Sequence, residues 1–536
     1  MISTIRRITH LNILKPWLVV RQVFLILAIG LVAISSGTAQ THAANGSYSF
    51  EIKDRDADSK PDATLETPRL RLMLSGATGN IAVYFLRGLN FEETLFPPIL
   101  TELGYKIATS SLRPFFLQVG GKDEIFPSEG YTFELASSTT SGVTIVARGS
   151  PNSSGLQLTK TYEFPIDSYA TQFRVGISNR GKQDLIIGSS EATNSSESVG
   201  LSLLYGPGLF LDPFTPSTFL ALQPLGQESH EKVEGLLAAA KKAKFSGIGV
   251  KTTYFCALME CRDPVNVNLS AQSFEVKSDD PQKRTFQGEV IGLSLPVLVL
   301  KPGEEKVYSF SLYLGPKFLD ELMGIGRAEV TDYGFLSTML LRVLQFFHQL
   351  YPNYGLAIIF LTLVVRAALY PLTLKQTKSM AQMQKIQPML QDIKDRHRDN
   401  PQKFNEEVLK LYQKHDVNPL GGCLPLLLQL PVLIALYNTI NIAVELRKVH
   451  FLWLADLSKA DPYLILPLVI AVLMYVQQGK MPDPQQQQMM AFMPMFMFII
   501  TWTLPSGLLL YWFTSSVVGV FQQLQANKLM AKIKEE

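Results

Sequence analysis

Arg366 is the residue whose position in the sequence most directly suggests a chemical role. It stands in an otherwise apolar segment, eight residues before Leu374, which on a helix places it ~12 Å from the end of the segment. An arginine that faces lipid at depth costs at least ~2.5–3.5 kcal/mol. Thr362 and Thr373 lie within about 40° of Arg366 on a helical wheel. We therefore expect Arg366 to line a water-filled cavity; the alternative is an arginine that extends to the lipid headgroups.

Two other apolar segments carry residues that could extend this polar lining. Gln429 stands in one of them, and Trp512, Ser516 and Gly519 form a comparable stripe in another. The other apolar segments contain no aspartate or glutamate, so we expect no intramembrane counter-ion for Arg366. Each polar residue alone is weak evidence, because such side chains often bridge helices.

The elements that must position these residues are five apolar segments, at 355–374, 420–441, 463–478, 489–504 and 506–521. Residues 484–527 contain no Asp, Glu, Lys or Arg, a composition typical of membrane helices. The third and fourth segments have about 16 apolar residues, or ~24 Å of helix, and would thin a bilayer whose core is ~30 Å thick. The whole chain is 47% hydrophobic and 18% charged with a formal net charge of +3, which excludes a disordered or nucleic-acid-coating protein.

Lysine and arginine predict the orientation of these segments. Residues 375–418 contain nine of them, whereas 442–462 contains three, balanced by three acids. We expect the first stretch and the C-terminus to be cytoplasmic and the second stretch to lie outside. Apolar residues at three- and four-residue spacing predict that 375–418 is an antiparallel helical hairpin with a docking role, rather than a solvated loop.

The preceding stretch, 335–351, is also apolar. We expect it to be an interfacial helix on the outer surface; a short additional span is the alternative.

The N-terminal part has a different composition. Residues 1–44 combine a basic start, an apolar core and a tail of small residues, which predicts a signal peptide or a signal-anchor helix. Residues 45–316 contain short runs with period-two alternation, which predict an exported antiparallel β-sandwich, interrupted by a helical patch at 232–244. A linker, 317–351, would connect it to the membrane part, 352–536.

The two cysteines of the predicted sandwich leave two possibilities open. Cys256 and Cys261 could form a disulfide in an oxidising compartment, or both could be buried free thiols. The sandwich has no phosphate-binding loop, nucleophile elbow or metal-spaced histidine pair, so we expect a scaffold or binding module rather than an enzyme.

The membrane part resembles the YidC family of membrane protein insertases, which includes relatives in mitochondria and chloroplasts. The similarity extends from Tyr333 to Gln525 and rests on short motifs. These are Val365-Arg366, Tyr370-Pro371-Leu372-Thr373, Met380-Ala381, Gln387-Pro388, Val417-Asn418-Pro419-Leu420-Gly421-Gly422-Cys423, Gln429-Leu430-Pro431, Ala435-Leu436-Tyr437, Asp461-Pro462-Tyr463, Phe492-Met493-Pro494, and Pro505-Ser506-Gly507-Leu508 before Tyr511. The predicted sandwich resembles, more weakly, the periplasmic domain of the Gram-negative members.

This resemblance implies a five-helix core around a hydrophilic groove that opens to the cytoplasm and lipid. Thr362, Arg366 and Gln429 match groove positions of the family, and Trp512 stands where relatives have the second of two tyrosines. Ser516 completes the groove that we predict. A methionine- and phenylalanine-rich stretch would form an apolar slide for the incoming helix. The residues are Met489, Met493, Phe496 and Met497; helix packing or lipid contact explains them equally well.

The resemblance also implies the partners. It predicts insertion and folding of inner-membrane proteins, alone or with the Sec translocon, in contact with nascent clients, the lipid bilayer and, weakly because the basic tail is short, the ribosome. We expect no nucleotide, DNA, metal or cofactor, so insertion would be driven by hydrophobic partitioning and the membrane potential, at ~2.3 kcal/mol per charge per 100 mV. Two alternatives are an anion transporter or channel that uses Arg366, and a membrane-anchored periplasmic protein that acts on carbohydrate.

Overall fold

A computed structural model of the chain describes most of its length. The described residues are 48–55, 58–89, 130–187, 245–263, 286–397, 400–415, 424–477 and 484–535, with shorter pieces at 93–96, 116–119, 122–123, 201–205, 218–224, 230–232 and 267–276. The predicted signal or anchor segment, 1–44, lies outside the described residues. The predicted helical patch at 232–244 also lies outside them, except for Lys232, which ends a strand.

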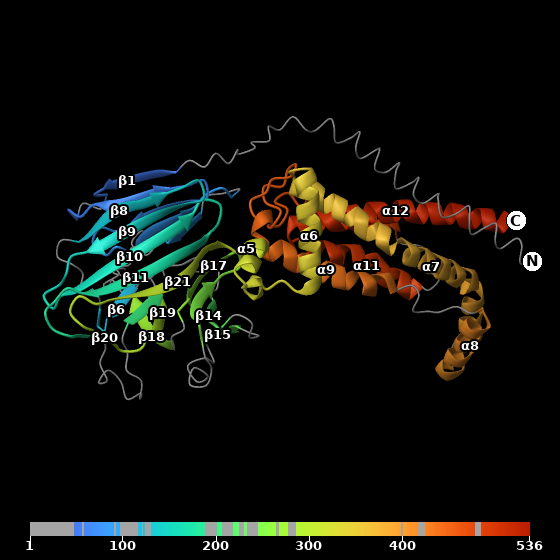
Figure 1. Ribbon diagram of the computed structural model, residues 1–536. Helices are drawn as coiled ribbons and strands as arrows, with labels where there is room; N and C mark the ends of the chain where they lie inside the picture. The colour runs from blue at the N-terminus through green and yellow to red at the C-terminus, as the bar shows by residue number, and fades with distance from the viewer. Residues whose placement is uncertain are drawn as a thin grey trace, which may run out of the picture. The chain divides into compact units, whose positions relative to one another are not determined.

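The N-terminal part of the described chain is built from antiparallel sheets, as its alternating sequence predicts. One sheet has the order β1 (Ser49–Lys53), β2 (Asp62–Glu66), β3 (Leu70–Leu74), β4 (Ile81–Leu86) and β5 (Glu93–Phe96). The largest sheet has the order β15 (His230–Lys232), β14 (Thr218–Leu222), β16 (Gly247–Lys251), β17 (Phe255–Cys261), β21 (Glu305–Pro316), β11 (Ala170–Asn179), β10 (Leu156–Pro165), β9 (Gly142–Gly149) and β8 (Tyr131–Ser138) (Figure 1).

Two smaller sheets complete this part. One pairs β12 (Leu185–Ile187) with β20 (Leu298–Leu300). The other has the order β18 (Asn268–Val276), β19 (Phe286–Ser294), β13 (Leu201–Tyr205), β6 (Phe116–Val119) and β7 (Lys122–Asp123).

The core of this part lies between the first sheet and the nine-stranded one. Alternate residues of β10 point inward, and Tyr162 stacks on Phe173 of β11 at a ring-centroid distance of 4.7 Å. These rings share one apolar core with Leu72 of β3 and Tyr84 of β4. Two packed sheets with inward-facing alternate residues form the β-sandwich that the sequence predicts.

Of the two possibilities for Cys256 and Cys261, the structure has the second: both cysteines are buried free thiols and form no disulfide. Both lie on β17, where Cys256 pairs in register with Gly315 and Cys261 with Phe310. Residues five apart on one extended strand point to opposite faces of the sheet, so the two thiols cannot meet. The alternative interpretation, two buried free thiols, is therefore the correct one.

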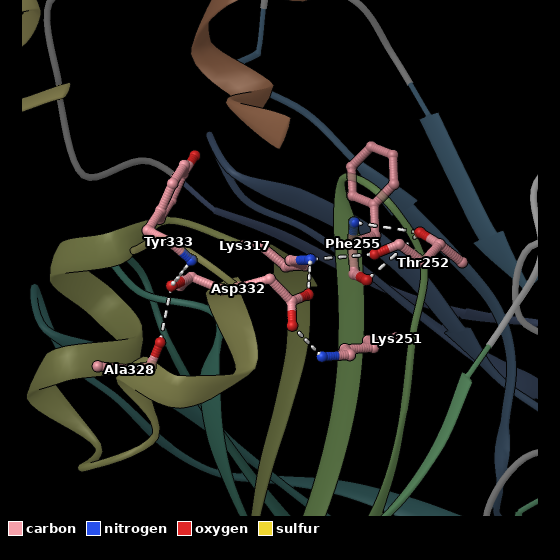
Figure 2. Close-up of polar contacts among 8 residues, drawn as sticks. Lys251, Thr252, Phe255, Lys317, Ala328, Asp332 and Tyr333 are labelled. Carbon is pink, nitrogen blue, oxygen red and sulfur yellow. Dashed lines mark hydrogen bonds and ion pairs between the residues drawn. The ribbon is translucent and has the colours of Figure 1, made fainter. Parts of the chain in front are cut away.

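An ion cluster of two buried lysines and one exposed carboxylate lies where β21 leaves the sandwich and is followed by α5 (Leu319–Gly324) and the short helix η3 (Ala328–Thr331). Figure 2 shows Lys251 of β16 and Lys317 approaching the same carboxylate, that of Asp332. The Nζ–Oδ distances are 2.5 Å from Lys251 and 3.1 Å from Lys317, which also donates to the carbonyl oxygen of Thr252. Burial alone would raise the pKa of Asp332, but its bonds and charge interactions with the two lysines lower it below the ordinary value.

The C-terminal part is helical, and each predicted apolar segment coincides with a helix (Figure 1). The helices are α6 (Phe335–Leu350), α7 (Tyr354–Arg396), α8 (Pro401–Lys414), α9 (Leu424–Ile442), α10 (Ile465–Gln477), α11 (Pro484–Thr501) and α12 (Ser506–Glu535), with the short helix η5 (Val444–Leu446) after α9. Residues of α6, α7, α9, α10 and α12 share one apolar core. Among the described residues, Tyr354–Leu374 is long and apolar enough to cross a membrane by itself, and α9, α10 and α11 contain shorter apolar stretches.

The first predicted segment does not end at Leu374. Helix α7 continues to Arg396 with Pro371 and Pro388 inside it, so the first arm of the predicted hairpin is a continuation of the first apolar segment. The second arm, α8, begins at Pro401, where the side chain of Asn400 caps the helix by accepting from the backbone N–H of Lys403. A small apolar cluster that includes Ile386 and Leu411 joins the two arms.

Helix α6 is amphipathic. Its Leu340, Leu341 and Leu344 are buried, whereas Phe335 on the other face is 88% exposed. The buried face packs on α9, where the Ser337 hydroxyl donates to the carbonyl oxygen of Ala435. Helix α6 thus packs on α9 through one apolar face and leaves an apolar side chain exposed on the other, and its position at a membrane interface stays a prediction.

Candidate functional site

Arg366 of α7 lies against α12 in the helical part. Its Nε donates a hydrogen bond to the hydroxyl oxygen of Ser515 at 2.7 Å. Hydrogen bonds to charged groups are stronger than those between neutral groups, so this contact fixes the direction of the guanidinium. Among the described residues, no carboxylate forms an ion pair with Arg366. The site therefore holds a positive charge that hydroxyl groups orient but do not neutralise.

Gln429 of α9 joins the same group of residues. Its Nε2 donates to the phenolic oxygen of Tyr511 at 2.7 Å and approaches Ser515 Oγ at 3.5 Å. Ser515 thus lies between Arg366 and Gln429, so residues of α7, α9 and α12 meet at one polar point. Their helices are held there by the apolar core that surrounds them, to which Leu436 and Leu509 contribute.

Gly519 lies directly beside the guanidinium of Arg366. A Cβ atom at position 519 would be 3.6 to 3.9 Å from the guanidinium atoms. The absent side chain leaves open the space next to the positive charge. Tyr511, Ser515 and Gly519 follow one another at intervals of four residues and share one face of α12.

The two threonines of the predicted polar stripe use their hydroxyl groups within α7. Thr362 is fully buried and donates to the carbonyl oxygen of Ile358 at 2.7 Å. Thr373 donates to the carbonyl oxygen of Leu369 at 3.1 Å. Both threonine hydroxyl groups thus donate to backbone carbonyl oxygens of their own helix. Arg366 is therefore the residue of this stripe that has the most hydrogen-bond donors.

The predicted stripe on the last span is displaced by one residue. The sequence suggested Trp512 and Ser516, whereas Arg366 and Gln429 contact Ser515 and Tyr511. Trp512 is partly buried and packs against the apolar core of the helices, and Ser516 is buried. The four-residue spacing of Tyr511, Ser515 and Gly519 is the sequence signal that could have identified the side of α12 that faces Arg366 and Gln429.

The methionine-rich helix α11 presents an exposed apolar surface. Met493 and Phe496 are exposed, and Met497 is partly buried; the side chain of Met489 lies outside the described residues. The most exposed side chains of this helix are Phe492, Met495, Phe496 and Ile499. The exposed stripe therefore shares Met493 and Phe496 with the predicted slide and extends to Phe492, Met495 and Ile499.

Comparisons with known proteins match both parts of the chain. The family described as 60Kd inner membrane protein matches residues 346–534, and the YidC periplasmic domain matches residues 64–346. The chain is 32% identical over 383 residues to the membrane protein insertase YidC of Geobacter sulfurreducens, which covers 70% of this chain and 69% of the relative. It is 44% identical over 244 residues to the insertase of Haemophilus influenzae, covering 44% and 45% of the two chains.

Two solved structures are also similar over most of their length. One is the crystal structure of an active YidC insertase with its first transmembrane domain resolved, at 19% identity and a TM-score of 0.37, covering 88% of this chain and 93% of that one. The other is YidC from Thermotoga maritima, at 14% identity and a TM-score of 0.31, covering 88% and 98%.

Proposed function

Because the chain belongs to the YidC family of membrane protein insertases, we propose that the polar site around Arg366 is the groove through which its clients enter the inner membrane. One observation carries this proposal. Arg366 is held by the neutral hydroxyl of Ser515, and no carboxylate among the described residues pairs with it. A cation arranged in this way attracts acidic and polar client segments.

The groove would act by lowering the cost of dehydration. A polar segment that crosses a bilayer loses its hydrogen bonds to water, at a cost of several kcal/mol per group. The guanidinium of Arg366, the amide of Gln429 and the hydroxyl of Tyr511 offer replacement partners. The segment would then need to cross only the remaining part of the membrane, driven by hydrophobic partitioning of the client and by the membrane potential.

Two helices would shorten that remaining path. Helix α10 has 13 residues, or ~20 Å, against a hydrocarbon core of ~30 Å. A span this short thins the bilayer around it. We propose that the exposed stripe of α11, with Phe492 and Phe496 at its centre, guides the apolar part of the client from the groove into this thinned lipid.

The proposed topology places the helical hairpin and the groove on the same side of the membrane. In this topology, five spans follow the interfacial helix α6. The two arms of the hairpin, which are the end of α7 and helix α8, lie in the cytoplasm. The C-terminus is cytoplasmic as well. The nine lysines and arginines of 375–418 support this orientation. The chain divides into a signal or anchor segment 1–44, a periplasmic sandwich 45–316, a linker with α6 at 317–351, and the insertase core 352–536.

The hairpin would provide the cytoplasmic contact with ribosomes and nascent clients, and the Sec translocon would be a partner for larger clients. An anion channel and a carbohydrate-active anchored protein are not favoured, since the similar curated proteins are membrane protein insertases.

The proposed function is tested by depleting the native insertase from cells and supplying this chain. We expect wild-type chain to restore insertion of a small two-span client, measured by protease accessibility of its exported loop, and Arg366→Glu to fail. Arg148→Glu, at an exposed arginine of the sandwich, is the matched control and should insert normally. Full insertion by Arg366→Glu would refute the groove, and failure of the wild-type chain would refute the proposed activity.

A further inference from the structure

A polar cavity lies beside helix α6, away from the proposed groove. It has a volume of about 310 Å³ and is bounded by Asp320 of α5, by Tyr354 at the start of α7, and by polar and aromatic residues of α6. Tyr354 is the first residue of the first membrane-crossing segment. The cavity therefore lies at the level where the proposed outer end of that span meets the lipid headgroups.

Arg342 stands beside the exposed apolar face of α6. At about 100° per residue, Phe335, Met339, Phe346 and Leu350 fall within about 60° of one another, and Arg342 lies about 20° beyond Phe335 at the edge of this arc. Phe346 and Leu350 are 56% and 63% exposed, and Phe346 also lines the cavity. Acyl chains that cover this apolar face would bring their headgroups to Arg342.

The charges around the cavity select the kind of headgroup. Arg342 forms an ion pair with Asp320, and both side chains are largely exposed. Gln345 donates to Glu445 at 3.3 Å, so a second acidic residue lies just behind the cavity wall. His348 stacks on Tyr354 at a ring-centroid distance of 3.9 Å, and burial lowers the pKa of its imidazole. The cavity lining thus offers one cation, Arg342, and one carboxylate, Asp320, which matches a headgroup that carries both charges.

We propose that this cavity binds the headgroup of a zwitterionic phospholipid that carries a primary amine, with its phosphate on Arg342 and its ammonium on Asp320. An exposed ion pair contributes little to stability, so its two members can exchange partners at low cost. The lipid supplies a new partner for both side chains at the same time. Its phosphate takes the place of Asp320 beside Arg342, and its ammonium takes the place of Arg342 beside Asp320. A quaternary amine would lose the N–H donors that the carboxylate accepts.

This inference rests on the proposed placement of α6 at the outer surface, and its test does not involve the groove. The full-length chain is reconstituted in nanodiscs with equal amounts of ethanolamine, choline and glycerol phospholipids. Bound lipids are then counted by native mass spectrometry after limited delipidation. We expect a preference of roughly three- to tenfold for the ethanolamine lipid, which is the size of one charge-assisted hydrogen bond.

Three variants separate the charges. Asp320→Asn should remove the preference for the ethanolamine lipid over the glycerol lipid, and Arg342→Gln should lower retention of all three lipids. The exposed pair Arg148 and Glu134 of the sandwich provides the matched controls Arg148→Gln and Glu134→Gln, which should bind lipid as wild type does. Thermal unfolding of each variant checks that it is folded.

The proposal is wrong if wild type prefers the glycerol lipid, or if Asp320→Asn keeps the ethanolamine preference. It is also wrong if soluble phosphoethanolamine displaces the retained lipid completely, because the acyl chains on α6 would then contribute nothing. Client insertion by Asp320→Asn at wild-type rate is expected in either case. A failure here is therefore distinguishable from a failure of the groove around Arg366.

Discussion

The sandwich and the helical part treat buried positive charge in opposite ways. Where the sandwich meets its linker, Arg327 lies 2.5 Å from Glu260, and the buried Lys251 and Lys317 share Asp332. In the helical part, Arg366 has the hydroxyl of Ser515 instead of a carboxylate among the described residues. Removing one partner of a buried ion pair is strongly destabilising, whereas a hydroxyl orients a cation and leaves its charge available. We infer that paired charges hold the sandwich together and that the charge of Arg366 serves the client.

The largest expected effect on stability is at Asp332. Asp332→Asn keeps a residue that tolerates the left-handed conformation of this position, φ 63°, and removes the negative charge from two buried lysines. We expect the free energy of unfolding to fall by about 3 kcal/mol, the low end of the range for buried pairs because the carboxylate is 43% exposed, as measured by chemical denaturation of the full-length chain in detergent. Asp167→Asn, at an exposed aspartate of the same part, is the control. A change below about 0.5 kcal/mol at position 332 would show that the pairing is not structural.

The next effect concerns Glu445, the buried acid behind α6, whose Oε2 has no hydrogen-bond partner among the described residues. Burial raises the pKa of this carboxyl from 4.5 to about 7. The folded state therefore keeps a proton that the unfolded state releases. The contribution of Glu445 to the free energy of unfolding is fully present below about pH 4.5 and is lost as the pH rises through 7. Between these two pH values this contribution changes by roughly 3 kcal/mol.

Glu445→Gln should remove this pH dependence, because an amide carries no titrating proton. The variant should unfold at a higher temperature than wild type at pH 8 and at nearly the same temperature at pH 5. Asp332 should act in the opposite sense, since its lowered pKa gives stability that is lost as the pH falls. Parallel melting-temperature profiles for wild type and Glu445→Gln would contradict the burial of a protonated acid.

A smaller effect is expected at Ser515, which orients the charge but does not carry it. Ser515→Ala removes one hydrogen bond to the guanidinium. The free energy that holds the guanidinium in place should fall by roughly 1 kcal/mol, which corresponds to about a fivefold decrease in the insertion rate. Ser516→Ala, one residue further along α12, should decrease the rate less. If Ser516→Ala proves the more damaging change, the phase of α12 that the sequence suggested is the functional one.

The features that the sequence predicts correctly are those set by local pattern. The alternation in Leu156–Pro165 predicts a strand with one buried face, and the apolar segments predict the helices. The side of α12 that faces Arg366 could not be predicted in this way, because the helices that pack against α12 decide where Tyr511 and Ser515 point. The continuation of α7 beyond Leu374 was missed for a related reason. A change from apolar to polar composition marks the end of a membrane segment, but it does not end a helix.

Contacts between distant residues explain the remaining differences. The shared carboxylate of Asp332 joins residues 81 and 15 positions away, and no local pattern specifies that pairing. The disulfide was considered because Cys256 and Cys261 are close in sequence, yet their positions on one strand direct them to opposite faces.

The most direct test of the central claim varies the charge at position 366 and the charge of the client together. Wild type, Arg366→Lys, Arg366→Ala and Arg366→Glu are each assayed for insertion of one client with an acidic, a neutral or a basic translocated tail. Thermal unfolding is measured on the same preparations. We expect Arg366→Lys to keep most of the activity, Arg366→Ala to lose more, and Arg366→Glu to lose most for the acidic tail, without a matching loss of stability. Insertion of the acidic-tail client by Arg366→Glu at the wild-type rate would contradict the claim that this unneutralised charge serves the client.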